Sequence, residues 1–190
     1  MKHLLYALLT AVSILFTSCG PSSNTNTPQE PNVPQPQPQP QPEVTQKVVI
    51  GYLALDDWEF ESLFPTIEWK YLTHINASFA RVKADGTLNI DPVRKRIESV
   101  RETAHKHNVK ILISLAKNSP GEFTTAINDP KARKELIQQI IAFTKEYKLD
   151  GFDIDYEEYD NWDKNFPSLL VFARGLYLAK EKNMLMTCAV

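Results

Sequence analysis

Five short apolar runs, each typical of a β-strand, alternate along this chain with segments of helical periodicity. The runs cover residues 48–54, 72–82, 109–116, 149–157 and 184–190. The first run is almost continuously apolar, as a strand is when both faces of its sheet are covered. Strands that begin roughly 25 to 40 residues apart, with helices between them, predict a parallel α/β sheet.

Three amphipathic segments between these runs predict helices. Two of them begin at the pairs Asp91–Pro92 and Asp129–Pro130, in which an N-cap residue precedes a proline of the first turn. The third covers about residues 163–182. The residues expected to be buried are Val93, Ile97, Val100 and Ala104 in the first helix, Leu136, Ile137, Ile140, Ile141 and Tyr147 in the second, and Leu169, Leu170, Ala173, Leu176 and Tyr177 in the third.

Doubly wound sheets and (β/α)8 barrels both produce this order of elements. No glycine-rich phosphate loop follows the first strand, which argues against a nucleotide-binding doubly wound sheet. A barrel needs about 250 residues, whereas the fifth strand of this sequence covers residues 184–190. We therefore expect an α/β fold of the (β/α)8 TIM-barrel type, C-terminally incomplete, with strands 1–5 in this chain. An open five-stranded domain is the alternative.

The first 19 residues have the pattern of a secretory signal. Lys2 supplies a basic start, residues 4–16 are apolar, and small polar residues follow. Residues 16–19, Phe-Thr-Ser-Cys, resemble the lipobox of bacterial lipoproteins. This resemblance implies lipid attachment at Cys19 and an extracytoplasmic place in the bacterial cell envelope, anchored to the outer membrane or cell surface. An ordinary cleaved signal is the alternative.

Residues 20–46 predict a linker and residues 47–190 a globular domain. Alternating Pro and Gln in the linker favour extended polyproline II structure and cannot build a core. The domain contains one cysteine, Cys188, so no internal disulfide is available, and no Cys-His cluster suggests zinc. The net charge of −2 gives no sign of a nucleic-acid partner. We expect a monomer.

The fourth strand segment carries a row of acids within the sequence LDGFDIDYEE, residues 149–158. Side chains two positions apart share one face of a strand, so Asp153, Asp155 and Glu157 are expected to crowd together. Repulsion and burial disfavour the ionised forms of such carboxyl groups. Because the C-terminal ends of barrel strands build the active site, Glu157 is the candidate acid catalyst and Asp155 its assistant.

Two other interpretations of this row are a calcium site and a solvated acidic strand end. An EF-hand loop that starts at Asp153 would need glycine at its sixth position and glutamate at its twelfth. Those positions hold Glu158 and Lys164, so the calcium pattern fails. The solvated strand end stays open when the residues are considered alone.

Residues 150–157, DGFDIDYE, resemble the DGxDxDxE signature of glycoside hydrolase family 18, the chitinases and endo-β-N-acetylglucosaminidases. GYLA at residues 51–54, LTHINASFARV at 72–82 followed by DGTL, and KILISLA at 110–116 are also similar to that family. The resemblance covers residues 47–190. It implies retaining hydrolysis of a β-1,4 bond next to N-acetylglucosamine, without a cofactor or metal.

The resemblance also implies a role for each acid. Glu157 would protonate the glycosidic oxygen. Asp155 would hold the acetamido N–H of the sugar, so that the acetamido oxygen attacks the anomeric carbon. Asp153 would share a proton with Asp155.

Four further residues are candidates for substrate binding. Tyr52 and Phe79 match aromatic positions of the family's sugar pocket, with core packing as the alternative. Ser114 matches the serine of the family's SxGG motif, whose glycines are replaced here by Ala116 and Lys117. Trp162 is expected to stack on a sugar face, with packing over the next helix as the alternative. The four candidates are therefore Tyr52, Phe79, Ser114 and Trp162.

The function expected from the resemblance is a lipid-anchored glycosidase, a chitinase-like hydrolase that cleaves chitin oligosaccharides. One alternative is an endo-β-N-acetylglucosaminidase acting on N-glycan cores, because the SxGG region is altered. Another is a non-catalytic chitinase-like glycan-binding protein, although Glu157 is intact. A structural envelope lipoprotein would leave the acid row without a role.

Overall fold

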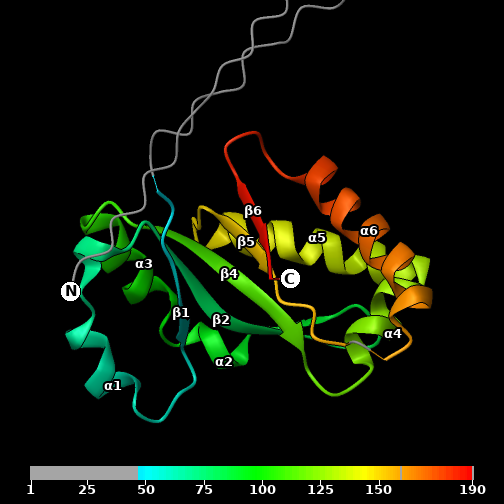
Figure 1. Ribbon diagram of the computed structural model, residues 1–190, viewed down its shortest axis with the longest axis horizontal. Coiled ribbons are helices and arrows are strands. Elements are labelled where there is room, and N and C mark those ends of the chain that lie inside the picture. The colour runs from blue at the N-terminus through cyan, green and yellow to red at the C-terminus, as the bar shows by residue number, and fades with distance from the viewer. Residues whose placement is uncertain (1–46, 159, 190) are drawn as a thin grey trace, which may run out of the picture. The chain divides into compact units, whose positions relative to one another are not determined.

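The computed structural model describes residues 47–158 and 160–189 of the 190-residue chain. Within these residues a parallel sheet contains all five predicted strands (Figure 1). They are β1 (Ile50–Ala54), β2 (His74–Val82), β4 (Lys110–Lys117), β5 (Gly151–Ile154) and β6 (Leu185–Cys188). A short additional strand, β3 (Leu88–Asn89), pairs antiparallel with the end of β2.

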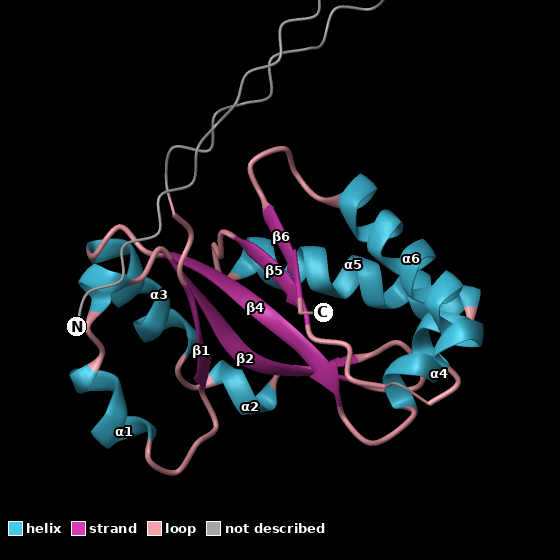
Figure 2. Ribbon diagram, viewed as in Figure 1, coloured by secondary structure: helices cyan, strands magenta, loops and turns pink. Residues whose placement is uncertain are grey.

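Helices connect the parallel strands (Figure 2). They are α1 (Phe60–Leu63), α2 (Asp91–Arg94), α3 (Ile97–Lys106), α4 (Glu122–Asn128), α5 (Pro130–Glu146) and α6 (Trp162–Ala179), with 3-10 turns at Phe64–Thr66 and Trp69–Tyr71.

The order of the parallel strands is β1-β2-β4-β5-β6, which is also their order along the chain. Crossovers between parallel strands are almost always right-handed. A doubly wound sheet reverses its strand order so that helices cover both faces, whereas an unreversed order places every crossover on the same face. This topology is that of the first part of a (β/α)8 barrel and confirms the predicted fold class.

The helix predicted from Asp91 is split in two by a break at Lys95 and Arg96. Asp91 is the first residue of α2 rather than its N-cap, which corrects the prediction. The Arg96 guanidinium donates to the carbonyl oxygens of Leu55 and Asp57 at 2.5 and 3.1 Å, a tertiary contact that helical periodicity does not reveal. The predicted apolar face is still fully buried across both pieces, at Val93, Ile97, Val100 and Ala104.

Helix α5 begins as predicted. The Asp129 carboxylate accepts a 2.7 Å hydrogen bond from the amide of Ala132, as an N-cap residue does. The predicted apolar stripe faces the core, with Leu136 and Ile140 fully buried and Ile137, Ile141 and Tyr147 packed against it.

Helix α6 buries Leu169, Phe172 and Leu176, and it packs against α4 and α5. Leu170 and Tyr177 were expected in the same stripe, but they are 52% and 63% exposed, so that prediction is wrong for both. Each follows a buried residue and therefore lies about 100° around the helix from it, on a side that no described residue covers completely.

Strand β5 ends at Ile154, so Asp155 and Glu157 follow the strand instead of lying within it. The Asp155 amide still donates to the Leu115 carbonyl at 3.0 Å, and the pairing with β4 therefore extends by one residue. Beyond Asp155 the side chains of Tyr156 and Glu158 bond to Thr124 in α4. The predicted span of this strand was too long at its C-terminal end.

The predicted signal segment, Cys19 and the linker lie outside the described residues, so the lipid anchor stays a prediction, as does the monomeric state. Among residues 47–158 and 160–189, no helix combines the length and apolar character needed to cross a bilayer.

Candidate active site

Polar side chains meet at one level of the sheet, on the face opposite the helices. Ser114 on β4 lies level with Asp153 on β5, and Asp153 lies level with Thr187 on β6. The residues that precede the first two, Ile113 and Phe152, point to the other face and are fully buried in the core. The strand register therefore places a hydroxyl group on each side of Asp153.

Asp153 is 1% exposed and accepts three hydrogen bonds from hydroxyl groups. The Tyr52 hydroxyl and the Ser114 hydroxyl donate to Oδ2 at 2.8 and 2.7 Å. The Thr187 hydroxyl donates to Oδ1 at 2.6 Å. A buried carboxylate is costly unless donors satisfy it, and these three hydroxyls hold Asp153 in one orientation.

These contacts change the interpretation of two predicted substrate-binding residues. Tyr52 and Ser114 lie next to the acids, where their hydroxyl groups contact Asp153, and their contact with a substrate stays a prediction. Partial burial and the hydrogen bond to Asp153 raise the pKa of Tyr52 to about 12. Thr187 was missed by the sequence analysis, because only the register of β6 against β5 brings it to Asp153.

Asp155 is 8% exposed, and its carboxyl group lies under the influence of both other acids. Burial raises the pKa of Asp155, and the negative charges of Glu157 and Asp153 raise it further. Lys117 and Arg81 oppose this rise without cancelling it. The structure thus brings the three acids within electrostatic reach of one another, whereas the proton shared by Asp153 and Asp155 stays a prediction.

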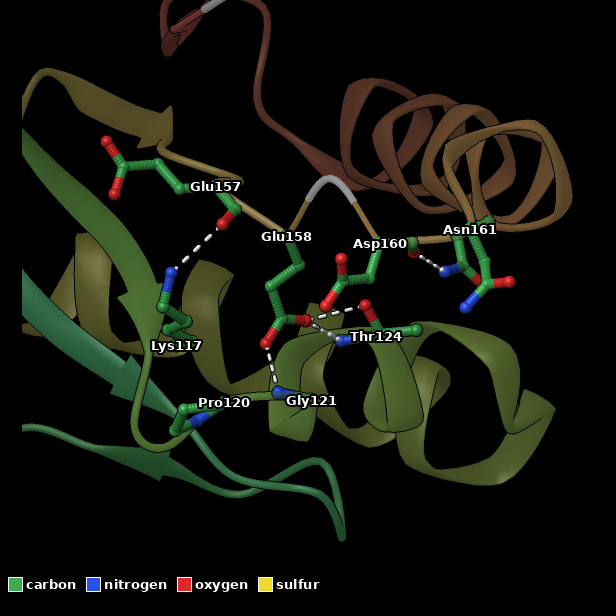
Figure 3. Close-up of a pocket in the computed structure, with 9 residues that line it drawn as sticks. Lys117, Pro120, Gly121, Thr124, Glu157, Glu158, Asp160 and Asn161 are labelled. Atoms are coloured by element: carbon green, nitrogen blue, oxygen red, sulfur yellow. Dashed lines mark hydrogen bonds between the residues drawn. The ribbon is translucent and has the colours of Figure 1, made fainter.

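Glu157 is exposed and borders a pocket of about 480 Å³ (Figure 3). The Lys117 ammonium group, from the end of β4, donates to the Glu157 backbone carbonyl at 3.0 Å. Lys117 occupies the last position of the SxGG motif that begins at Ser114, where the family it resembles has glycine. The pocket therefore has a cation at this position. The pocket is lined by Lys117, Pro120, Gly121, Thr124, Glu157, Glu158, Asp160, Asn161 and Asn165.

The remaining two candidates belong to separate aromatic groups. Phe79 is half-buried, with its ring 6.3 Å from that of Tyr52 and the Arg81 guanidinium 5.0 Å above it. Trp162, at the start of α6, is 38% exposed and lies 5.1 Å from the ring of Phe166 and 6.2 Å from that of Tyr156. Trp162 therefore has both an exposed surface and a packing role, and its contact with a sugar stays a prediction.

Asp150, the first acid of the sequence motif, lies at the other end of β5. Its carboxylate bonds to His105 at 2.8 Å, to Lys110 at 3.0 Å and to the Ile111 amide at 2.9 Å. Although burial opposes the shift, these hydrogen bonds lower the pKa of Asp150. This acid ties α3, β4 and β5 together and is remote from the pocket beside Glu157.

Glu158 also lines the pocket beside Glu157. From the sequence it served only to exclude an EF-hand, and no role in the site was predicted for it. It is 9% exposed and bonds to Gly121 and Thr124 at the start of α4. In residues 47–158 and 160–189, no group of three or more His, Cys, Asp or Glu side chains is arranged to hold a metal ion.

The chain matches one family and several solved structures. The sequence model described as "Glycosyl hydrolases family 18" matches residues 48–190. The crystal structure of a chitinase from Bacteroides thetaiotaomicron is 99% identical, with a TM-score of 0.75, over 76% of this chain and 46% of that one. A chitinase from Cycas revoluta, crystallised with (GlcNAc)3, shares the fold at 23% identity and a TM-score of 0.65, over 74% of this chain and 45% of that one.

Curated relatives agree with these structures. Chitinase B of Serratia marcescens is 27% identical in a match 144 positions long, which covers 60% of this chain and 28% of that protein. A chitinase-like effector of Moniliophthora roreri is 27% identical over 93 residues, 48% of this chain and 23% of that protein. The chain therefore spans less than half the length of each of these relatives.

Proposed function

We propose that this chain, which belongs to glycosyl hydrolases family 18, is a glycosidase that cleaves β-1,4 bonds next to N-acetylglucosamine in chitin oligosaccharides. The observation that carries the proposal is the graded series of acids. Asp153 is fixed by three hydroxyls, Asp155 is buried with a raised pKa, and Glu157 is exposed at a pocket. Three of the relatives reported above are named chitinases, and these names support the substrate class.

In the proposed reaction Glu157 donates a proton to the glycosidic oxygen as the bond to the anomeric carbon breaks. The acetamido oxygen of the same sugar attacks that carbon, and an oxazolinium ion forms with the configuration inverted. Water, deprotonated by Glu157, then opens this ion with a second inversion, so the configuration is retained.

Asp155 orients the acetamido N–H during this attack and balances the developing positive charge. Its raised pKa fits a carboxyl group whose ionisation is opposed by both neighbouring acids. The hydroxyl groups of Tyr52, Ser114 and Thr187 hold Asp153 beneath it. This arrangement supports a division of roles in which Glu157 exchanges the proton with the substrate and Asp155 acts on the acetamido group.

The test is to incubate the protein with chitin oligosaccharides and an N-glycosylated protein together and to weigh the products by mass spectrometry. Because the chain spans less than half the length of its relatives, the complete gene product is assayed beside the 190-residue chain. Glu157→Gln is the matched variant, since it keeps the shape of the side chain and removes the acid. We expect oligosaccharide cleavage that falls about 100-fold or more in the variant.

Cleavage confined to the N-glycoprotein would instead favour an endo-β-N-acetylglucosaminidase. Lys117, which places a cation where the family has glycine, is the observation that favours this second candidate. Glycan binding without cleavage, equal in the wild type and in Glu157→Gln, would overturn the enzyme assignment.

A further inference from the structure

The strand that leads to the proposed acid ends too early to hold it. The last ladder hydrogen bond of β5 toward β4 is made by the amide of Asp155, two residues before Glu157. Glu157 is exposed, and residues of a strand-end loop with few contacts move more freely than the sheet. A catalytic group must nevertheless be held within a fraction of an ångström of its working position. Something outside the sheet therefore has to fix this segment.

Glu158, the next residue, has contacts that do so. One carboxylate oxygen accepts the amide proton of Gly121 at 2.5 Å. The other accepts from the amide and from the hydroxyl of Thr124, both at 2.6 Å. With 9% of its surface exposed, this carboxylate satisfies donors at the start of α4 that have no intrahelical acceptor.

The residue before Glu157 is tied to the same point. The hydroxyl oxygens of Tyr156 and Thr124 are 2.5 Å apart. Since the single hydroxyl proton of Thr124 is donated to Glu158, Tyr156 is the donor in this bond. The Tyr156 ring also packs edge-on against Phe123, at 5.4 Å between centroids.

Glu157 itself is held through its backbone. Its carbonyl accepts from Lys117, the last residue of β4, at 3.0 Å, so each of the three residues 156–158 has a contact with the end of β4 or with the start of α4. Figure 3 shows the side chains of Glu157 and Glu158 leaving the backbone in different directions, the former away from Gly121 and Thr124 and the latter directed at them. The buried Glu158 thus fixes the backbone of this segment and leaves the side chain of Glu157 available for the reaction.

We propose that Glu158 is a positioning residue, which locks the segment carrying Glu157 onto the start of α4 through Gly121 and Thr124. The inference rests on the proposed function for its effect on catalysis. Glu158 touches no substrate in this role. It acts by holding Glu157 where the acid can reach the glycosidic oxygen.

Glu158→Gln is the direct test, because a carboxamide presents an NH2 group to donors that now find an oxygen. A small displacement of a catalytic group costs up to about 100-fold in rate, so we expect kcat to fall about 10- to 100-fold with KM changed by less than about threefold. Glu146→Gln, which removes an exposed carboxylate from α5, is the matched control and should leave kcat unchanged.

Thr124 supplies a second, milder pair of variants in case Glu158→Gln does not fold. Thr124→Val removes the hydroxyl that links Tyr156 to Glu158, while Thr124→Ser keeps it. We expect kcat to fall in Thr124→Val and to stay close to the wild-type value in Thr124→Ser. Equal kcat in all three proteins would overturn the proposal.

Hydrogen–deuterium exchange of the unliganded protein separates this inference from the proposed function. We expect the amides of residues 121–124 and 156–158 to exchange faster in Glu158→Gln than in the wild type, and to be unaffected in Glu146→Gln. Unchanged exchange, or an unchanged kcat in an active enzyme, would overturn the positioning role. The two proposals can also fail separately. If the wild type cleaves no glycan, and Glu158→Gln still exchanges faster than the wild type at these amides, the proposed function is overturned and the structural role of Glu158 is supported.

Discussion

The Tyr52 hydroxyl donates a 2.8 Å hydrogen bond to Oδ2 of Asp153, which joins β1 to β5 across 101 residues of sequence. Strands β2 and β4 lie between them in the sheet. In a flat sheet β1 and β5 would be about 14 Å apart, three spacings of about 4.8 Å, and side chains stand nearly perpendicular to a sheet. The bond therefore requires the sheet to curve toward this face, as the wall of a barrel does.

Tyr52→Phe tests the role of this bond. The variant keeps the ring contact with Phe79 and removes one of the three donors to Asp153, so we expect a loss of about 1–2 kcal/mol in the free energy of unfolding. We also expect a lower kcat and a shifted pH profile of kcat, because Asp153 acts on the ionisation of Asp155. Tyr71→Phe, at an exposed tyrosine, is the control. An unchanged pH profile would argue that Tyr52 only packs.

The pKa of Asp155 predicts how stability depends on pH. Burial and the charges of Glu157 and Asp153 raise this pKa above its ordinary value of 3.8. Between pH 3.8 and the raised value, the folded chain therefore binds a proton that the unfolded chain has released. The free energy of unfolding consequently falls as the pH rises through this window.

Asp155→Asn removes the carboxyl group, and with it the fall in the free energy of unfolding as the pH rises. We expect the variant to be more stable than the wild type at neutral pH, by a margin that shrinks as the pH falls toward 3.8. Denaturant midpoints across this range measure the margin. A margin that does not change with pH would contradict the raised pKa.

Gly151 is required by the close approach of β5 and β6. A Cβ atom at this position would lie 2.1 Å from the carbonyl oxygen of Leu185, which is backbone and cannot rotate away. We expect Gly151→Ala to destabilise the fold by about 1–3 kcal/mol or more, measured as a lower denaturant midpoint.

Gly175→Ala on α6 is the matched comparison for that substitution. Outside its own helix, its new Cβ would come closer than 3.0 Å only to the terminal Cδ1 of Ile137, at 2.6 Å, and this side chain can turn aside. Replacing a glycine inside a helix by alanine stabilises the helix by about 0.5–1 kcal/mol. We therefore expect little net change in the free energy of unfolding of Gly175→Ala. If Gly151→Ala and Gly175→Ala lost equal stability, the close approach at Gly151 would not explain the loss.

The lipid anchor is tested in cells by Cys19→Ala. The cysteine is the attachment point that the lipobox resemblance implies, so we expect the variant to leave the membrane fraction and appear in the soluble fraction of the envelope or the medium. Membrane association that survives the substitution would contradict the lipoprotein assignment.

Local patterns in the sequence were enough to predict the order of strands and helices. Near-continuous apolar runs, the Asp129–Pro130 helix start and the buried stripes of α3 and α5 depend on neighbours within a few residues, and the structure confirms them. The stripe of α6 was assigned too broadly, because which side of a helix is covered depends on the elements packed against it. The break between α2 and α3 was missed for a similar reason, since Arg96 bonds to residues far along the chain.

By itself the sequence determined the α/β class, the placement of Asp153, Asp155 and Glu157 near the end of one strand, and the family resemblance that gave them roles. Tertiary structure alone decided what these acids touch. The three donors to Asp153 come from three other strands, and the partners of Glu158 come from the start of α4. Such contacts depend on strand register and sheet curvature, which arise from packing summed over the whole domain and leave no local signal in the sequence.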